Sequence, residues 1–348
     1  MLLNDSCDYN VIYRIAQEQS VVGLITAGIS LVENIKIPQN IKLQLVGETL
    51  QIENRNKEMN AFVARLLKKL QDYNISTFLV KGQGIAQCYE KPLWRTCGDV
   101  DLLADEDNYK KAHIFLKSLS SNCKAELSGE KHIEYEIEGW TVELHGNLPS
   151  RLFKRIDRRL FEIQKSIGAK GLVRVWHDEE TDILMLSPDE DVIFVFTHLL
   201  KHFFHGGVGL RQICDWVRLI WTFRDIIDKD LLETRIRNMG ISTEWRVFAY
   251  FAVNKLGMPS ESMPLYENKN SLKIKSEKIS SFILNVGNMG HNRDTSFYVR
   301  YPYVIRKAIS LYRQCDDLLH HAMIFPIDSL RLIPSVVFNG LISAVRME

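Results

Sequence analysis

The tripeptide Asp99-Val100-Asp101 places two carboxylates at a spacing that could do chemistry. Side chains alternate between the two faces of a strand, so the two aspartates project together if this segment is a strand. Val100 and Leu102 then face the core. Two negative charges a few ångströms apart repel each other unless a cation neutralises them, and hard divalent cations such as Mg²⁺ bind carboxylate oxygens. Taken alone, such a tripeptide is more often a solvated strand end, so its context has to decide.

A glycine turn precedes the two aspartates. We expect an apolar strand over 78–80, a break at Lys81-Gly82 and a helix over 83–89. Gly82 has no β-carbon to block a close backbone approach, and the first N–H groups of a following helix favour phosphate. Paired aspartates beside a glycine turn therefore favour metal-assisted phosphoryl chemistry.

Further motif positions follow the turn: Tyr89, Pro92, Arg95 and Gly98-Asp99-Val100-Asp101-Leu102-Leu103. Together with Lys81-Gly82, this set resembles the uncharacterised bacterial nucleotidyltransferase family of the DNA polymerase beta-like superfamily, most closely over residues 75–148. The superfamily typically places a glycine-containing turn before its acidic strand and takes a third carboxylate from a later strand. Its usual turn is Gly-Ser or Gly-Gly, whereas this chain has Lys81-Gly82-Gln83-Gly84.

Glu143 is the candidate for the third carboxylate that the resemblance implies. Two runs with strand character, 133–137 and 140–144, flank a Glu-Gly pair, which predicts a hairpin. Alternation puts Val142 and Leu144 inward and Glu143 on the opposite face. We expect the hairpin to pair with the aspartate strand, which would give a mixed sheet.

The resemblance implies transfer of a nucleoside monophosphate from an NTP to a hydroxyl acceptor, with release of pyrophosphate. Two Mg²⁺ ions, or Mn²⁺, would supply positive charge. Asp99, Asp101 and Glu143 are then the expected metal-binding and catalytic residues. The expected nucleotide-binding residues are Lys81, Gly82, Gln83 and Arg95.

A histidine face follows the acidic unit. The spacing predicts a helix over 189–205, with His198, His202 and His205 on the side away from its apolar stripe. A second helix over 210–223 places Arg211, Asp215 and Arg218 on one flank. A solvated or partner-bonded face and a substrate contact are both open, and zinc is the weakest reading, because no Cys or His cluster elsewhere offers further ligands. The candidate substrate-side residues are His145, His198, His202, Arg211 and Asp215.

The composition limits which partners and which compartment we expect for the chain. The 348 residues include 46% hydrophobic residues and carry 44 Lys and Arg against 43 Asp and Glu, a formal net charge of +1. Such a balance argues against a protein that coats nucleic acid. Six scattered cysteines without a Cys-x-x-Cys pair are typical of a reduced, cytoplasmic protein. We expect neither a signal peptide nor a membrane span.

The predicted fold class is α+β, a small mixed β-sheet nucleotidyltransferase core flanked by an N-terminal helical segment and a larger C-terminal helical domain. The expected boundaries are 1–74 for the N-terminal helices, 75–150 for the catalytic core, 151–259 for a helical domain on the substrate or nucleotide side, and 260–348 for a linker with C-terminal helices. The polar run 260–275 is the linker candidate, with helix resuming at Ser276.

Three alternatives remain open. A catalytically silent relative would bind a nucleotide or a protein partner without turnover. A glycosyltransferase would use the Asp-x-Asp pair for Mn²⁺ and a nucleotide sugar, although that class usually has strand-helix alternation before the acidic motif, where this chain looks helical. A nucleic-acid-tailing enzyme suits the superfamily but not the neutral charge. The sequence selects neither the acceptor nor the base.

Overall fold

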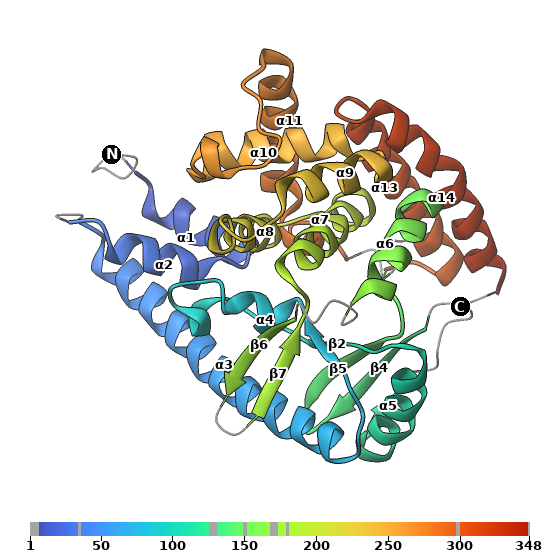
Figure 1. Cartoon of the computed structure of the whole chain (residues 1–348). Coiled ribbons are helices and arrows are strands. Elements are labelled where there is room, and N and C mark those ends of the chain that lie inside the picture. Colours follow the sequence, from blue (N-terminus) through green and yellow to red (C-terminus); the bar gives the residue numbers. More distant parts are fainter. Residues whose placement is uncertain are drawn as a thin grey trace.

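The computed structural model describes residues 7–33, 36–124, 131–148, 152–167, 173–178, 181–296 and 300–346. One mixed sheet of seven strands lies between helical layers (Figure 1). In spatial order its strands are β3 (Asn122–Cys123), β4 (His132–Ile137), β5 (Trp140–His145), β2 (Val100–Leu103), β1 (Phe78–Val80), β7 (Thr181–Met185) and β6 (Arg174–Asp178). The predicted α+β class with a mixed sheet is confirmed.

Strand β2 lies at the centre of this sheet. It runs antiparallel to β1 and parallel to β5, and its residue Asp101 stands opposite Val80 on one side and Glu143 on the other. β5 also pairs with β4 in the predicted hairpin. The expected pairing between the hairpin and the aspartate strand is therefore present, and it puts two acidic side chains in direct register.

Two helices cover one face of the sheet, α3 (Gln39–Asp72) and α5 (Glu106–Leu119). Their apolar stripes pack on Val100, Leu102 and Leu144 in one buried cluster. On α3 the packed positions recur at helical spacing: Met59, Phe62, Val63, Leu66, Leu67 and Leu70. Because this face takes the apolar side chains of β2, Asp101 emerges on the opposite one.

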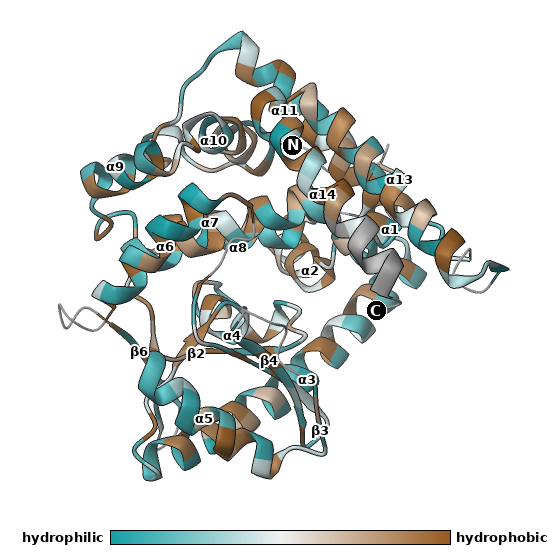
Figure 2. Ribbon diagram, turned by 90° about the vertical axis from the view of Figure 1, so that its right-hand side faces the viewer, coloured by the Kyte–Doolittle hydropathy of each residue, from teal (hydrophilic) through white to brown (hydrophobic). Residues whose placement is uncertain are grey.

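The opposite face is covered by a helical layer that forms the largest buried cluster of the described residues (Figure 2). Its helices are α4 (Gly82–Ala86), α6 (Lys154–Ser166), α7 (Pro188–His205), α8 (Leu210–Thr222), α9 (Lys229–Met239), α10 (Ser242–Leu256), α11 (Asn270–Val286), α13 (Tyr303–Ala322) and α14 (Pro326–Arg346). At the N-terminal end, α1 (Tyr9–Glu18) and α2 (Val22–Ser30) form a small cluster with the start of α3. Within the described ranges, 3₁₀ turns occur at η1 (Pro92–Trp94), η2 (Ser260–Ser262) and η3 (Asn288–Gly290).

Three elements differ from the sequence-based expectation. α4 ends at Ala86 rather than at residue 89, because the Cys88 carbonyl accepts hydrogen bonds from Arg218 and Thr222 of α8. α11 begins at Asn270, six residues before the predicted resumption of helix. β7 was not predicted; it pairs in parallel with β1 and, with β6, extends the sheet beyond the expected core of 75–150.

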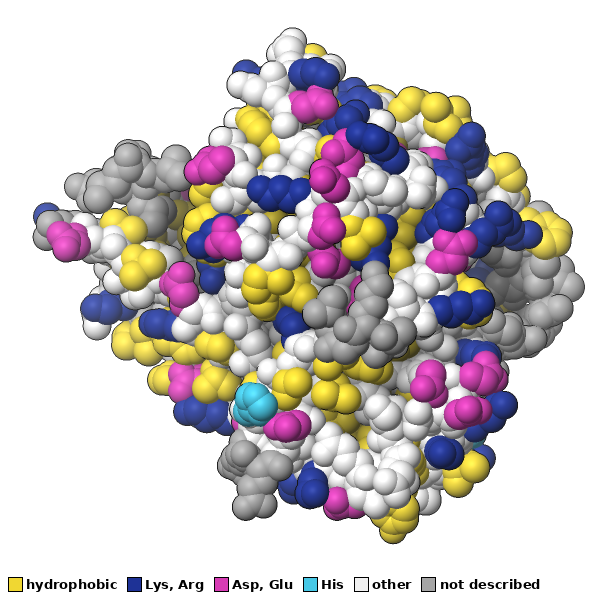
Figure 3. Space-filling model, viewed as in Figure 1, with side chains coloured by type: hydrophobic (Ala, Val, Ile, Leu, Met, Phe, Trp, Pro, Cys, Tyr) yellow, Lys and Arg dark blue, Asp and Glu magenta, His cyan; other side chains and the backbone are white. Residues whose placement is uncertain are grey.

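The surface is mixed in charge. On the face drawn in Figure 3, Lys and Arg side chains are interspersed with Asp and Glu. Across the residues that the structure describes, we find no helix with the length and apolar character needed to cross a membrane.

Candidate functional site

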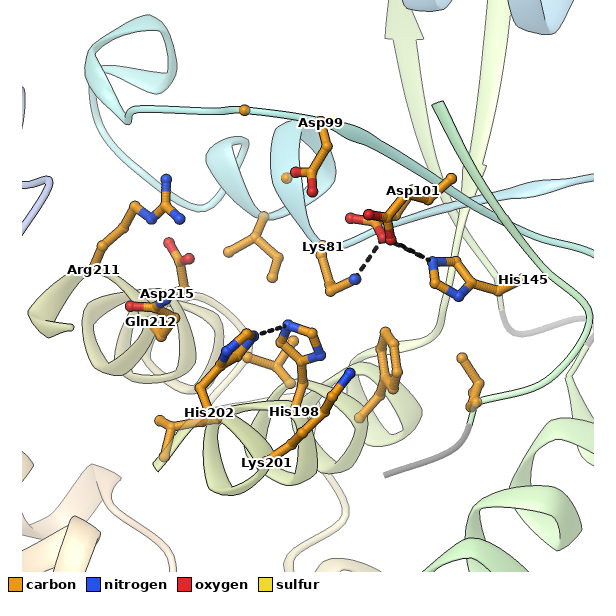
Figure 4. Close-up of a pocket in the computed structure, with 18 of the residues that line it drawn as sticks. Lys81, Asp99, Asp101, His145, His198, Lys201, His202, Arg211, Gln212 and Asp215 are labelled. Atoms are coloured by element: carbon orange, nitrogen blue, oxygen red, sulfur yellow. Dashed lines mark hydrogen bonds and ion pairs between the residues drawn. The ribbon is translucent and has the colours of Figure 1, made fainter. Parts of the chain in front are cut away.

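A cavity of about 290 Å³ lies between the sheet and the helical layer (Figure 4). Its sheet side is formed by residues of the turn after β1, the start of β2 and β5: Lys81, Gly82, Gly98, Asp99, Asp101, Glu143 and His145. Its helical side is formed by His198, Lys201 and His202 of α7 and by Arg211, Gln212 and Asp215 of α8. The structure thus brings together candidates that are more than 100 residues apart in the chain.

The turn after β1 has an unusual backbone. Lys81 has φ 58° and ψ −144°, a left-handed conformation that costs a residue with a β-carbon of order 1 kcal/mol or more. Gly82 follows with φ 33°, and a β-carbon added to it would lie 3.3 Å from the Asp99 carbonyl oxygen. This backbone places Lys81 Nζ 2.5 Å from Asp101 Oδ1. The strain is thus located where the chain passes closest to the acidic residues.

Asp101 and Glu143 share a set of basic partners. Asp101 is only 2% exposed and, besides the Lys81 ion pair, accepts a hydrogen bond from His145 Nε2 at 2.8 Å. Glu143 Oε2 lies 3.1 Å from His132 Nε2 and 3.4 Å from His145 Nε2. One ammonium group and two imidazoles therefore surround two carboxylates from adjacent strands.

Asp99 differs from this pair. It directly precedes β2 rather than lying within it, and its carboxylate points into the cavity in Figure 4. Burial and the charge of Asp101 raise the pKa of Asp99 above its usual value. At neutral pH an ionised Asp99 is therefore under-compensated, which is the electrostatic condition for binding a cation.

Two neighbours of Asp99 are stabilised in their charged forms. Burial alone would raise the pKa of Glu143, but hydrogen bonds from His132 and His145 lower it well below its usual value. For Lys81, burial alone would lower the pKa, but the charges of Asp101, Glu143 and Asp99 raise it overall. Glu143 and Lys81 thus both stay charged at neutral pH.

Arg95 is held by α8. Its guanidinium makes two hydrogen bonds to Asp215, Nε to Oδ1 at 3.0 Å and Nη2 to Oδ2 at 2.5 Å, and it is 5% exposed. Tyr89 donates a further hydrogen bond to Asp215 Oδ1 at 2.9 Å. The Arg95 donors that were expected to bind phosphate are thus largely engaged within the protein, although the residue borders the cavity.

Arg211 is the less compensated arginine. Its Nη1 donates to the Thr96 carbonyl at 2.9 Å, while its buried Nε has no partner among the described residues. Burial and the nearby charge of Arg95 lower the pKa of Arg211. A buried cation with spare donors at a cavity wall is suited to an anionic group.

Two histidines of α7 form a neutral pair. The Nε2 atoms of His198 and His202 are 2.8 Å apart, so one nitrogen donates to the lone pair of the other. Burial, with the charge of Lys81 next, lowers the pKa of His198 well below its usual value. Burial, with Lys201 next, lowers the pKa of His202 to about 4. His205 is exposed and does not line the cavity, so the predicted three-histidine face does not act as one unit.

Gln83 is placed differently from the prediction. Its side chain is 2% exposed, and its amide donates to Asn56 Oδ1 of α3 at 3.1 Å, outside the cavity lining. A nucleotide contact by this side chain does not agree with that placement. The physical reason is that α4 turns its second residue toward α3, whose Asn56 also bonds the carbonyls of Leu93 and Arg95.

Sequence reasoning missed His132. It is the first residue of β4 and stands directly opposite His145 in the hairpin register. The two rings stack, with centroids 4.7 Å apart. The predicted hairpin turn at Glu138-Gly139 contained the needed signal. His132 precedes this turn by as many residues as His145 follows it, so a tight hairpin makes the two histidines cross-strand partners.

Three carboxylates at the cavity have the chemistry to hold a divalent metal, although within the described residues the ligand atoms that lie within 4.8 Å of one another are those of His132, Glu143 and His145. Asp99, Asp101 and Glu143 line one wall of the cavity and offer the oxygen ligands that Mg²⁺ and Mn²⁺ bind. The raised pKa of Asp99 reflects negative charge that lacks enough positive charge around it. A cation at this wall would relieve that imbalance.

Comparison with known proteins assigns the family. No curated protein matches the chain significantly. Among solved structures, the crystal structure of an antigenic nucleotidyltransferase-like protein from Paracoccidioides brasiliensis is similar, with 17% identity and a TM-score of 0.37 over 61% of this chain and 95% of that one. Residues 5–257 match the sequence model of a family described as uncharacterised nucleotidyltransferase. Since the match spans more than half of its length, the chain belongs to the uncharacterised nucleotidyltransferase family.

Proposed function

We propose that the protein is a nucleotidyltransferase that uses Mg²⁺ or Mn²⁺ to move a nucleoside monophosphate from an NTP to a hydroxyl acceptor, releasing pyrophosphate. The observation that carries the proposal is that Asp99, Asp101 and Glu143 line one cavity beside the strained Lys81-Gly82 turn. Membership of the family supports the same reaction class. The base and the acceptor are not part of the proposal.

The acidic residues would hold the cations. Asp99 would bind them from the position just before β2, Asp101 from β2 and Glu143 from β5. When bound, divalent cations supply positive charge where negative charge builds on the entering and leaving oxygens. A carboxylate at this position could also take the acceptor proton. The strongly lowered pKa of Glu143 makes it a weak base, so binding of a cation is better supported for this residue than proton transfer.

The basic residues would hold the nucleotide. Gly82 permits close backbone approach, and Lys81 is a positive group at the same turn. Arg211 faces them across the cavity with its spare Nε donor and would contact a phosphate oxygen (Figure 4). Arg95 and Asp215 would act indirectly, by fixing the loop that carries Asp99.

The neutral histidines would contact the acceptor. His198 and His202 line the cavity from α7, and because their Nε2 atoms bond to each other, the neutral pair has one Nδ1 that is a donor and one that is an acceptor. Such groups suit hydroxyl groups better than phosphates, because they carry no charge. This arrangement agrees with the substrate-side role expected for the two residues.

The decisive experiment is transfer of label. The protein is incubated with each α-labelled or γ-labelled NTP, Mg²⁺ or Mn²⁺ and a small-molecule extract, and products are separated and analysed by mass spectrometry. We expect label from the α-position in a new product, release of pyrophosphate and loss of both in EDTA. Asp99→Asn should abolish transfer, whereas Asp107→Asn, which removes an exposed carboxylate at the start of α5, should not.

One observation favours a second candidate, the catalytically silent relative. Lys81 Nζ lies 2.5 Å from Asp101 Oδ1, so the negative charge of this carboxylate is already balanced by an ammonium group of the protein. A silent nucleotide-binding protein would bind NTP equally in Mg²⁺ and in EDTA and would transfer no label from any of the four NTPs. That result would replace the transferase proposal with the binding one.

The compartment is also a proposal. All six cysteines are free, with Cys88 and Cys97 buried, and the described residues contain no disulfide. Free thiols are typical of a reducing environment, which supports the expected cytoplasmic location.

A further inference from the structure

Three side chains at the end of the β4–β5 hairpin converge on one point. They are His132 from β4 and Glu143 and His145 from β5. Both Nε2 atoms approach the same carboxylate oxygen, Glu143 Oε2, at 3.1 and 3.4 Å. One potential ligand atom from each residue lies within 4.8 Å of the other two, and all three side chains are partly exposed.

We propose that His132, Glu143 and His145 bind a divalent ion of the Zn²⁺ type, which would share Glu143 with the Mg²⁺ expected at the aspartates. Imidazole nitrogens are ligands for Zn²⁺ and similar ions, whereas Mg²⁺ prefers oxygen. Ligand atoms about 2.1 Å from a tetrahedral Zn²⁺ stand about 3.4 Å apart, close to the separations of both imidazoles from Glu143. The two nitrogens and one oxygen would leave a fourth position of a tetrahedral ion for another ligand.

The sheet preorganises these ligands. His132 and His145 are cross-strand partners, so their stacked rings are fixed by the hairpin register rather than by flexible loops. Glu143 is two residues from His145 on the same strand and shares its face. The three ligands therefore need little rearrangement to close around an ion.

Binding has a chemical cost that limits the pH range. A ligating imidazole nitrogen carries no proton, so the ion must replace the N–H groups that now donate to Glu143 and, from His145, to Asp101. The alternative interpretation is that the two imidazoles serve only as counter-charges for the carboxylates. The two interpretations predict opposite results in a metal-binding experiment.

Co²⁺ is a suitable probe, since its visible spectrum reports coordination. The full chain is stripped with a chelator and titrated with Co²⁺, and affinity for Zn²⁺ is obtained by competition. We expect one high-affinity ion per chain that excess Mg²⁺ does not displace. His132→Gln and His145→Gln should each weaken binding at least about tenfold. His177→Gln, which removes an exposed histidine on β6, is the matched control and should not change it.

The design separates this site from its neighbours. If His198→Gln removes the signal while His132→Gln does not, the ion binds the α7 pair and the proposal is wrong. X-ray absorption of the Zn²⁺-loaded wild type counts coordinated imidazoles without any mutation, and fewer than two would overturn it. Absence of binding to the wild type would favour the counter-charge interpretation.

The transferase proposal can fail independently. Asp99→Asn should abolish label transfer but leave the Co²⁺ spectrum unchanged, because Asp99 is not one of the three ligands. Transfer that requires Mg²⁺ alone, in a protein without Co²⁺ binding, would leave the transferase proposal standing and remove this one.

Discussion

Asp99 and Asp101 are equivalent in sequence pattern but not in surroundings. Asp101 is buried and paired with Lys81 and His145, whereas Asp99 lies just outside β2 with a raised pKa. Removing the charge of Asp101 would leave the Lys81 ammonium without its partner. Removing the charge of Asp99 would relieve its repulsion by Asp101. The alternating pattern treats the two aspartates alike, whereas their partners in the structure separate them.

We therefore expect opposite effects on stability. Asp101→Asn should lower the free energy of unfolding by about 3 kcal/mol, the cost of breaking a buried ion pair. Asp99→Asn should leave it unchanged or raise it at pH 7. A raised folded-state pKa means that the folded protein gains stability as pH falls through that pKa, so the advantage of Asp99→Asn should vanish below about pH 4. Urea denaturation over a pH series measures both.

An Asp101→Asn protein more stable than the wild type would contradict this assignment. It would mean that the 2.5 Å contact with Lys81 costs more in desolvation than it returns. Lys81→Met is the complementary variant, because it removes the ammonium instead. If Lys81→Met in the Asp101→Asn background restores stability, the loss was due to the unpaired charge.

For single residues, the sequence predicted on which face of a strand a side chain lies, because local periodicity controls that placement. Alternation along β5 correctly placed Glu143 away from the core cluster that holds Val142 and Leu144. It could not show that Gln83 turns toward Asn56, because that contact depends on how α3 crosses the sheet. The pairing of Arg95 with Asp215 lies equally beyond local pattern, since the residues are 120 positions apart.

Among the elements, the loop between η1 and β2 positions Asp99. It has no regular hydrogen bonding of its own, and α8 holds it through Arg95 and Asp215 at one point and through Arg211 and the Thr96 carbonyl at another. Asn56 of α3 holds the Arg95 carbonyl from the other side. The position of Asp99 therefore depends on two helices that are separate in sequence.

A double-mutant cycle tests this connection. Arg95→Met and Asp215→Leu should each lower the free energy of unfolding by about 3–5 kcal/mol, because each leaves one buried charge unpaired. The double variant should be no worse than the more damaging single one, since neither charge remains. Urea denaturation gives the coupling energy, with Arg159→Met, which breaks an exposed i,i+3 pair, as the control. Additive losses would show that the pair does not join the loop to α8.

The boundaries of long elements were predicted from the sequence pattern, whereas those of short elements were not. The long amphipathic helices α7 and α8 begin within one residue of the predicted positions. The short elements do not follow the pattern: α4 ends where α8 takes the Cys88 carbonyl, and β7 forms by pairing with β1 about 100 residues earlier. Their boundaries are decided by tertiary contacts that a single sequence does not display.

At the scale of the whole molecule, helices outside the family match pack in one buried cluster with the cavity helix α7. The match ends at residue 257, and α11, α13 and α14 lie beyond it. The region expected as 260–348 packs on α7, whose other side carries His198 and His202. We propose that this region acts as a support for the cavity helix, and the contact between α13 and α7 is where the proposal can be tested.

His321 of α13 lies at the centre of that contact. It is 1% exposed, and its ring stacks on Phe203 of α7 with centroids 4.1 Å apart. Phe204, Phe282 and Phe325 close the remaining sides. Burial, with the charges of His320 and Arg293 acting in the same direction, lowers the pKa of His321 to about 3. The imidazole is therefore neutral in the folded protein at all pH values above that.

This burial makes the molecule sensitive to acid. The unfolded chain binds a proton at His321 near pH 6.5 and the folded chain only near pH 3, so stability is complete above pH 6.5 and falls as pH decreases between the two values. At pH 5 the loss amounts to about 2 kcal/mol. His321→Phe should remove that part of the pH dependence and raise the Tm at pH 5 more than at pH 7.5, whereas His177→Gln, at an exposed histidine on β6, should change neither. An unchanged pH profile in His321→Phe would mean that α13 separates from α7 before His321 is protonated, and that the C-terminal helices do not support the cavity under acidic conditions.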